Sequence, residues 1–255
     1  MTSMDEIGAA YDAASALWRA GPERMYARLS DAMADHAPVE VVGARVLDAG
    51  AGTGVAGDAL RRRGAGTVVA VDLAHGMLPR PPALSAVGDL TGLPFADGTF
   101  DLAAAGFSLN HFEDPTAAMV ELRRVAGALL ATVFAPQWDH PCKEAIEGVL
   151  IETGFQPPAW YTTFKAGCSW ELGPPELEAF AAAAGFGHAE ATVVEVDTGL
   201  STPADLVDWR FGMAHSAPYV AALAPDERAR LRRDAEAAVV GLPPLVVSMV
   251  VLSAR

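Results

Sequence analysis

The stretch VLDAGAGTG, residues 46–54, decides the fold of this 255-residue chain. It joins an apolar run at 44–48 to a segment of helical composition at 56–63 through a cluster of glycines. Glycines at such a turn allow a tight bend and let the backbone approach a ligand closely. The first amide groups of the following helix can face an anion. The stretch therefore predicts a strand-to-helix unit with a ligand site where the strand ends.

From this stretch onward the chain alternates between strand-like and helix-like segments. Further strands are expected at 67–71, 85–88, 100–108, 127–134, 191–196 and 245–252. Further helices are expected at 6–20, 23–36, 115–126, 175–184, 202–215 and 225–239, whereas residues 136–171 show little periodicity. Near-continuous apolar strands in such an alternation predict an α/β fold with a mostly parallel sheet covered on both faces.

The composition argues against several classes of function. The formal net charge is -14, from 32 acidic and 18 basic residues, and no basic stripe is visible, so no nucleic-acid partner is expected. Cys142 and Cys168 lack metal-ligand spacing, so no metal site is expected. The polar N-terminus is unlike a signal peptide, and the longest apolar run, 244–252, is too short for a membrane span. These features predict a soluble cytoplasmic protein without membrane contact. A monomer or homodimer is expected, and the sequence does not choose between the two.

An acidic residue strengthens the ligand-site interpretation of the glycine cluster. Asp72 closes the second expected strand and follows Gly52 by 20 positions (72 − 52 = 20). A carboxylate at this place can accept hydrogen bonds from both ribose hydroxyls. Gly52, Gly54 and Gly57 also satisfy the dinucleotide-binding fingerprint. The loop and the acid therefore predict an adenosine-containing cofactor, but they do not choose between cofactors, and each residue taken singly could serve only as a cap or loop group.

Four ordered motifs across residues 46–115 resemble those of class I S-adenosylmethionine-dependent methyltransferases, in the branch of ubiquinone-biosynthesis-type and natural-product enzymes. They read VLDAGAGTG at 46–54, VDLAHGML at 71–78, GDL at 88–90 with LPFADGTFD at 93–101, and LNHFEDP at 109–115. The chain departs from the family at 124–127, where RVAG lacks the usual Pro-Gly pair before the fifth strand. The resemblance implies a doubly wound, mostly parallel seven-stranded sheet of the Rossmann-like methyltransferase type.

The resemblance also implies a single domain over 1–255. Residues 1–40 would be an N-terminal helical cap, and residues 41–135, 172–198 and 244–255 the cofactor-binding core. Residues 136–171 and 199–243 would be lid insertions that bind the acceptor. Aromatic and other apolar side chains concentrate in these insertions, which favours an apolar or aromatic acceptor: Trp138, Trp160, Tyr161, Phe164, Trp170, Trp209, Phe211, Met213 and Tyr219.

The resemblance implies that S-adenosylmethionine is the cofactor and S-adenosylhomocysteine the product. Asp48 would hold the ammonium group of the methionine part, Asp72 the ribose, and Asp89 the adenine amino group. The full set of implied cofactor-binding residues is Tyr11, Asp48, Gly50, Gly52, Gly54, Asp72, Leu73, Met77, Asp89, Leu90, Phe107 and Asn110.

A base is needed only where the acceptor must lose a proton, and histidine can take one near neutral pH. His140 follows the fifth expected strand, at the edge where ligands bind in open α/β sheets, and is the first candidate. His111 lies in the LNHFEDP loop and is the second, although it could simply order that loop. His215 ends an expected helix, where its charge suits the helix dipole, and is set aside.

The sequence therefore predicts a methyltransferase that acts on a small apolar or aromatic metabolite in secondary metabolism. Two alternatives keep the fold and cofactor: an enzyme with a non-methylating reaction such as cyclisation, and a module that senses the cofactor without chemistry. A nicotinamide-dependent oxidoreductase is disfavoured because that fold would not require Gly88-Asp89-Leu90.

Overall fold

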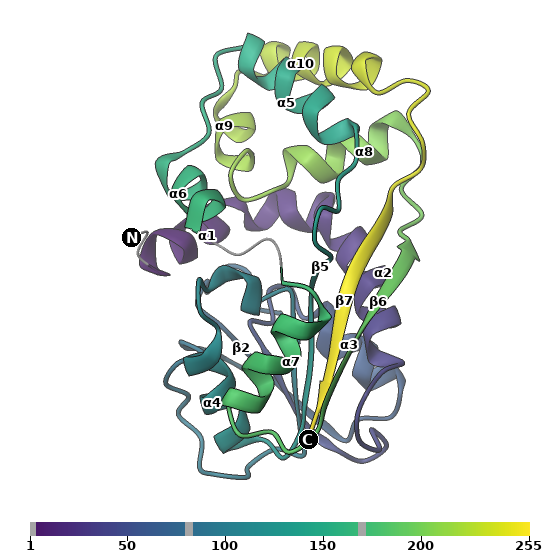
Figure 1. The fold of residues 1–255 in the computed structure, drawn as a ribbon. Coiled ribbons are helices and arrows are strands. Elements are labelled where there is room, and N and C mark those ends of the chain that lie inside the picture. Colours follow the sequence, from purple (N-terminus) through teal and green to yellow (C-terminus); the bar gives the residue numbers. More distant parts are fainter. Residues whose placement is uncertain (1–3, 80–83, 168–171) are drawn as a thin grey trace.

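A seven-stranded sheet forms the centre of the computed structural model, which describes residues 4–79, 84–167 and 172–255 (Figure 1). The strand order is β3-β2-β1-β4-β5-β7-β6. The strands are β1 (Arg45–Ala49), β2 (Thr67–Asp72), β3 (Leu84–Val87), β4 (Leu102–Gly106), β5 (Leu129–Phe134), β6 (Ala189–Asp197) and β7 (Val246–Ala254). Strand β7 runs antiparallel to β5 and β6, and the pairs among β1 to β5 are parallel. The predicted mostly parallel α/β fold is confirmed.

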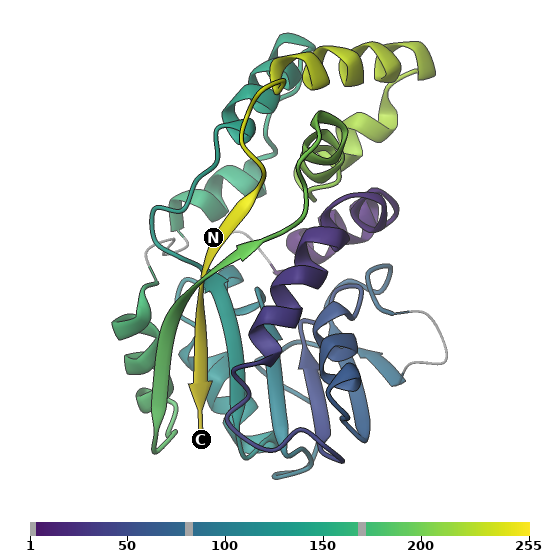
Figure 2. The ribbon, with the colours of Figure 1, turned by 90° about the vertical axis from the view of Figure 1, so that its right-hand side faces the viewer.

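Helices cover both faces of the sheet because successive strand residues point to opposite sides. Val46 of β1 packs in a cluster with residues of α2 (Pro22–Ala34) and α3 (Val55–Arg62). Its neighbour Leu47 packs in the other cluster, with residues of α4 (Thr116–Val125) and α7 (Pro174–Ala183). Figure 2 shows the two sets of helices on opposite sides of the sheet. The centre of the sheet is therefore buried on both faces.

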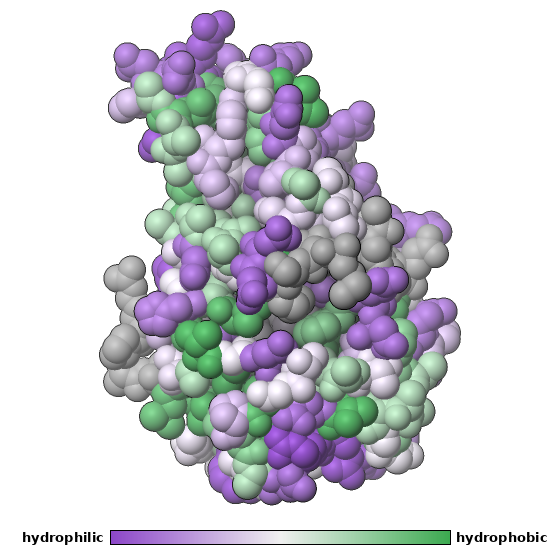
Figure 3. Space-filling view, turned by 90° about the vertical axis from the view of Figure 1, so that its left-hand side faces the viewer, coloured by the Kyte–Doolittle hydropathy of each residue, from purple (hydrophilic) through white to green (hydrophobic). Residues whose placement is uncertain are grey.

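A second helical layer stands over the end of the sheet where the parallel strands finish (Figure 1). It contains α1 (Met4–Ala20), α5 (Cys142–Glu152), α6 (Ala159–Gly167), α8 (Pro203–Phe211), α9 (Ala217–Ala222) and α10 (Pro225–Ala238). Hydrophilic side chains gather at the outer end of this layer, at the top of Figure 3. None of the helices in the described parts of the chain is long and apolar enough to cross a membrane.

The structure differs from the sequence prediction mainly between 136 and 171. This segment contains α5 and α6, and α9 is also a helix that the sequence did not predict. Helix α5 buries Cys142, Ile146 and Leu150, which are spaced four residues apart and therefore share one helical face. The strand expected at 100–108 ends at Gly106, because Phe107 has a left-handed φ of 57°.

The strand order reverses between β2-β1 and β4-β5, and this arrangement determines where a ligand can bind. Strand β1 pairs with β2 on one side and with β4 on the other. The loops that leave β1 and β4 therefore turn to opposite faces and leave a crevice between them. In open α/β sheets, ligands bind at such a switch point, outside the carboxyl ends of the strands.

Candidate functional site

A cavity of about 820 Å³ lies at this crevice and extends into the helical layer. Its lining includes loop residues after β1, β2, β4 and β5, together with side chains of α1, α2, α5, α6 and α8. Of the cofactor-binding residues predicted from the sequence, the structure places eleven on the lining: Tyr11, Asp48, Gly50, Gly52, Asp72, Leu73, Met77, Asp89, Leu90, Phe107 and Asn110. The twelfth, Gly54, does not line the cavity.

The glycine loop after β1 has a conformation that side chains would obstruct. Gly50 has a φ of +68°, and a Cβ there would lie 2.3 Å from the Cβ of Ser108. The backbone N–H groups of Gly50 and Ala51 both donate to the Val71 carbonyl, at 2.8 and 2.9 Å, which ties the loop to β2. Gly54, with a φ of +90°, caps α3 and packs against Pro79 instead of facing the cavity. Gly54 therefore shapes the turn, and Gly50 allows the loop to pack closely against Ser108.

Asp48, at the end of β1, is a buried carboxylate that is only partly satisfied. It is 1% exposed, and its Oδ2 accepts a hydrogen bond from the Gly57 N–H at 2.8 Å. Its Oδ1 is buried without a hydrogen-bond partner among the described residues. Burial raises the pKa of Asp48 to about 7, and the Gly57 bond opposes that rise. An oxygen of this kind on a cavity wall suits a cationic ligand group.

Asp72, at the end of β2, is held by the loops around it. Its Oδ2 accepts from the Gly52 N–H at 2.7 Å, and its Oδ1 accepts from the Ala74 N–H at 2.8 Å. Burial raises the pKa of Asp72, while the hydrogen bonds from Ala74 and Gly52 work against the rise. Each carboxylate oxygen can accept a further hydrogen bond. The geometry therefore leaves Asp72 able to accept from a pair of ligand hydroxyls.

Asp89 lies after β3 and fixes its own loop. Its Oδ1 accepts from the backbone N–H of Thr91 at 2.8 Å and from the Thr91 hydroxyl at 2.9 Å. Leu90, which follows it, is 7% exposed, and Met77 is 2% exposed. These apolar side chains lie on the same cavity wall as the carboxylates. The wall thus offers a flat apolar surface next to hydrogen-bond acceptors.

Aromatic rings form a continuous wall from α1 to the loop after β5. Neighbouring ring centroids lie 5.4, 5.0, 5.3, 4.6 and 4.9 Å apart along the series Tyr11, Trp18, Tyr26, Phe107, Phe134 and Trp138. Phe107 belongs to this wall with a φ of 57°, a conformation that costs on the order of 1–3 kcal/mol for a residue other than glycine. Such strain persists only where the surroundings hold the residue in place. The position of the Phe107 ring is therefore set by its neighbours.

His111 is the histidine that the structure places beside the predicted cofactor residues. Its Nε2 lies 3.3 Å from the hydroxyl of Tyr11, and the two rings meet edge to face with centroids 5.5 Å apart. Burial lowers the pKa of His111 to about 4. The imidazole is therefore neutral near pH 7 and has a nitrogen that can accept a proton. Asn110, the residue before it, also lines the cavity.

The predicted placement of His140 at the ligand crevice is wrong. His140 is 6% exposed and does not line the cavity. Its Nδ1 lies 2.9 Å from the Cys142 Sγ and accepts from the Cys142 N–H at 3.3 Å, at the start of α5. The chain turns at Gln137, which has a φ of 60°, and the indole of Trp138 donates to the Val246 carbonyl at 2.9 Å. Gln137, Trp138 and Asp139 line the cavity, whereas the side chain of His140 does not.

The helical layer adds charged groups to the cavity that the sequence did not predict. Arg210 of α8 is almost fully buried, and its Nη2 lies 3.4 Å from the His215 Nε2 and 3.9 Å from the Glu147 Oε2. His215 lines the cavity too, and its ring stacks on Tyr161 with centroids 4.0 Å apart. The sequence gives little signal for Arg210, because arginine side chains are usually exposed.

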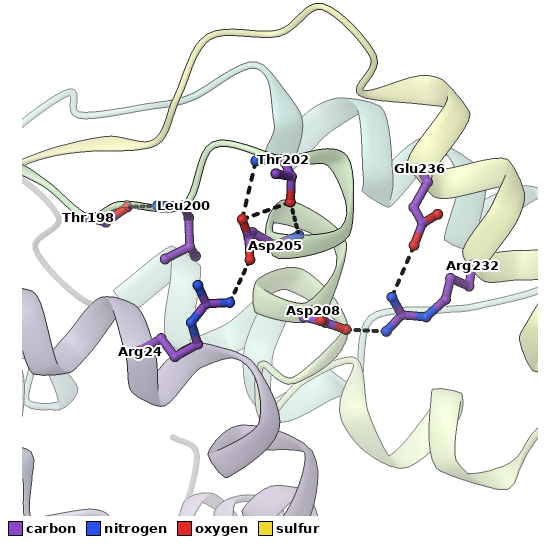
Figure 4. A network of polar contacts seen from close by, with 8 residues as sticks. All are labelled: Arg24, Thr198, Leu200, Thr202, Asp205, Asp208, Arg232 and Glu236. Atoms are coloured by element: carbon purple, nitrogen blue, oxygen red, sulfur yellow. Dashed lines mark hydrogen bonds and ion pairs between the residues drawn. The ribbon is translucent and has the colours of Figure 1, made fainter.

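Helix α8, which carries Arg210, is tied at its N-terminus and along its outer side (Figure 4). Asp205 accepts from the Thr202 hydroxyl at 2.7 Å within a capping box and pairs with Arg24 of α2 at 2.5 Å. Asp208 pairs with Arg232 of α10, which also pairs with Glu236 at 3.0 Å. These contacts fix α8 between α2 and α10 and so hold its cavity-facing side chains in place.

Several other cavity residues were not predicted from the sequence. Trp18 and Tyr26 sit on the inner faces of α1 and α2, where an amphipathic pattern could have indicated them. Ser108 is tied to β1 by its hydroxyl, which donates to the Ala49 carbonyl at 2.8 Å. Trp170, named above among the aromatic residues, lies outside the described residues. Within 4–79, 84–167 and 172–255, no group of His, Cys, Asp and Glu side chains is arranged to hold a metal ion.

The fold and the cavity wall are those of doubly wound proteins that bind an adenosine-containing cofactor where β1 meets β4. The methyltransferase domain family matches residues 47–128. A demethylmenaquinone methyltransferase of Paenarthrobacter aurescens is 30% identical over 185 residues, which cover 66% of this chain and 71% of the relative. The chain belongs to the class I S-adenosylmethionine-dependent methyltransferase family.

Two further relatives match over shorter parts. A demethylmenaquinone methyltransferase of Renibacterium salmoninarum is 35% identical over 146 residues, covering 54% of this chain and 57% of the relative. A malonyl-[acyl-carrier protein] O-methyltransferase of Halorhodospira halophila is 36% identical over 168 residues, covering 60% of this chain and 52% of the relative. The chain thus spans little more than half the length of these two relatives.

Known structures share the fold at low identity. An Anabaena variabilis protein described as a methyltransferase from an antibiotic biosynthesis pathway superposes with a TM-score of 0.59 at 15% identity, covering 88% of this chain and 96% of that one. The [4+2]-cyclase SpnF superposes with a TM-score of 0.52 at 20% identity, covering 90% of this chain and 80% of that one. At these identities the similarity concerns the fold alone.

Proposed function

We propose that this protein transfers the methyl group of S-adenosylmethionine to a small molecule with an apolar or aromatic body. The observation that carries the proposal is one continuous cavity. It runs from the carboxylates of Asp48, Asp72 and Asp89 at the sheet to the aromatic wall of the helical layer. A cavity of about 820 Å³ has room for a cofactor and a small acceptor side by side.

The residues at the sheet end fit this cofactor. The buried Oδ1 of Asp48, which has no hydrogen-bond partner among the described residues, suits the ammonium group of the methionine part. The carboxylate of Asp72 has acceptor capacity left for two ribose hydroxyls. Asp89 would accept from the adenine amino group, and Met77 and Leu73 would pack on the ring. Gly50 lets the loop after β1 pack closely against Ser108, where a Cβ would clash.

When bound, this cofactor supplies a methyl group on a sulfonium, which is already a strong electrophile. The chain's main task is then to hold the acceptor close and aligned, which provides much of the rate. The aromatic wall around Phe107 would exclude water and orient a flat acceptor. Where the acceptor is a hydroxyl or an ammonium, the neutral imidazole of His111 would take its proton, with Tyr11 holding the ring.

The names of the relatives support a small acceptor but leave its identity open to experiment. One relative is named for demethylmenaquinone and another for a malonyl group on a carrier protein. The aromatic wall of this chain favours a flat or apolar body. We propose that residues 1–40, 136–171 and 199–243 form the acceptor-binding layer. Secondary metabolism, a cytoplasmic location, and a monomeric or homodimeric state stay predictions.

The test is an assay with isotope-labelled methyl S-adenosylmethionine and a panel of phenols, quinols and aromatic acids. Transfer of label to one acceptor, with release of S-adenosylhomocysteine, is the expected result, and Asp72→Ala should reduce it at subsaturating cofactor. Conversion of a compound without cofactor consumption would instead establish a non-methylating enzyme such as a cyclase. Tight cofactor binding with no turnover of any compound would favour a sensing module.

A further inference from the structure

We propose that the acceptor carries a carboxylate and that Arg210 binds this carboxylate in the helical wall of the cavity. The inference rests on the proposed function and names its substrate class. Arg210 is a charged group on the cavity wall that the cofactor does not require. Arg210 lines the cavity, yet it comes from α8 and not from the loops that surround the cofactor-binding residues.

The guanidinium of Arg210 is buried with donors left over. Its side chain is 7% exposed, and its Nε is buried with no hydrogen-bond partner among the described residues. The Glu147 Oε2 lies 3.9 Å from Nη2, which is longer than a hydrogen bond. A guanidinium stays protonated at any ordinary pH, and burying its charge with incomplete compensation is unfavourable. An anion that pairs with the guanidinium would therefore stabilise this buried charge.

The planar geometry of the guanidinium suits a carboxylate. Its N–H groups lie in one plane and can pair with both oxygens of a carboxylate. The Trp209 ring lies beside it, 5.3 Å from the Arg210 Cζ, and keeps one face apolar. Glu147 is 26% exposed and retains more contact with water than Arg210 does. A ligand carboxylate would thus complete a pairing that Glu147 makes only at long range.

Lys143, the other cation that the structure places on the cavity wall near α5, is already engaged. Its Nζ pairs with Asp139 at 3.0 Å and lies 3.9 Å from the centroid of the Trp138 ring. Its side chain is 25% exposed, so its charge is also better hydrated than that of Arg210. Of the two cations, Arg210 is therefore the one suited to bind an anion within the cavity.

Arg210 is also held in position, which favours selective binding. It lies two residues after Asp208, and the contacts of α8 with Arg24 and Arg232 anchor this helix on both sides (Figure 4). A side chain on an anchored helix loses little freedom when it binds a ligand. The anchoring residues themselves do not line the cavity, so they provide a control for effects that act only through the helix.

A carboxylate could come from the acceptor or from the methionine end of the cofactor, and the placement favours the acceptor. The charged groups that act on Asp48, at the expected methionine end, are Asp72, Arg61 and Asp58. Arg210 instead acts on Tyr26 of α2, where it lowers the pKa against the effect of burial. The Tyr26 ring belongs to the aromatic wall that would face the acceptor.

The experiment titrates the full-length protein with 2-naphthoic acid and with 2-naphthamide, with and without saturating S-adenosylhomocysteine. The two probes share one aromatic body and differ in charge. The unaltered protein should bind the acid at least tenfold more tightly than the amide. Arg210→Gln should remove this preference, Arg210→Lys should keep part of it, and Arg232→Gln should keep it within twofold. Melting curves should show that each variant is folded.

Three results would overturn the inference. The first is equal binding of acid and amide, or binding of neither, by the unaltered protein. The second is a preference for the acid that survives Arg210→Gln. The third is an Arg210→Gln variant that loses affinity for S-adenosylhomocysteine as strongly as for the acid, which would assign the anion to the cofactor. Failure of the proposed function is separate, because it would appear as absent methyl transfer in the labelled-methyl assay while the probe titrations without cofactor still report on Arg210.

Discussion

Asp48 should make the affinity for the cofactor depend on pH. Its pKa lies at about 7 in the free protein because the carboxyl group is buried. A ligand ammonium at its Oδ1 favours the ionised carboxylate and lowers this pKa. Below about pH 7, binding must therefore release a proton, and the apparent affinity for S-adenosylhomocysteine should rise with pH.

The size of the effect follows from the fraction of Asp48 that is ionised. With a pKa of about 7, the carboxyl group is ionised in about nine tenths of free molecules at about pH 8 and in about one tenth at about pH 6. If the pKa in the complex is well below 6, the affinity should fall about tenfold over this interval. This fall corresponds to about 1.4 kcal/mol. Above about pH 8 the curve should flatten.

The assay is calorimetric titration with S-adenosylhomocysteine between about pH 6 and pH 8, repeated in buffers of different ionisation enthalpy to count protons. Asp48→Asn is the matched control, because an amide oxygen can still accept from the Gly57 N–H while no proton is exchanged. Its affinity should be lower and nearly independent of pH. Affinity that stays within twofold across the range in the unaltered protein, or a slope that persists in Asp48→Asn, would show that Asp48 does not exchange a proton when the cofactor binds.

The remaining predictions concern stability, the ribose site and the base. Folding raises the pKa of Asp48, so the free energy of unfolding of the ligand-free protein should fall as the pH rises from about 4 through about 7, by up to ~4 kcal/mol. Denaturant titrations should show a smaller fall in Asp48→Asn. Asp72→Ala should weaken cofactor binding at least tenfold, because it removes the ribose acceptor; a change within twofold in a titration would contradict the site. Gly50→Ala should destabilise the fold by ~2 kcal/mol or more, visible as a lowered Tm, because its Cβ would lie 2.3 Å from that of Ser108. With a hydroxyl acceptor, His111→Ala should lower kcat about a hundredfold while His140→Ala changes it less than twofold, and the reverse order would reassign the base.

The core of the fold was predictable because its signals are local. The glycine cluster at 46–54, the acid that ends β2 and the apolar strands all appear within short stretches of sequence. Two helices within 136–171 were not predicted. Aromatic residues interrupt the pattern of the short α6. Helix α5 contains no Pro or aromatic residue, and its repeat of Cys142, Ile146 and Leu150 every four residues was a usable signal. The six-residue α9 is too short to give a clear periodic pattern.

The site residues, like the fold, were predictable where their signals are local in the sequence. The carboxylates and Gly50 follow from motifs on adjacent strands, and the structure brings them to one wall. The position of His140 was wrong because strand order places a loop at the crevice but does not say how the loop turns, and Gln137 reverses the chain there. Arg210 was missed because its role depends on the packing of α8 against α2 and α5, which brings together residues far apart in the sequence.

The identity of the cofactor can be decided by parallel calorimetric titration with S-adenosylmethionine, S-adenosylhomocysteine and NADH. We expect both adenosyl compounds to bind at one site per chain, to bind at least tenfold more weakly to Asp72→Ala, and NADH not to bind. A folded protein that binds NADH, or that binds neither adenosyl compound, would show that the cofactor assignment is wrong.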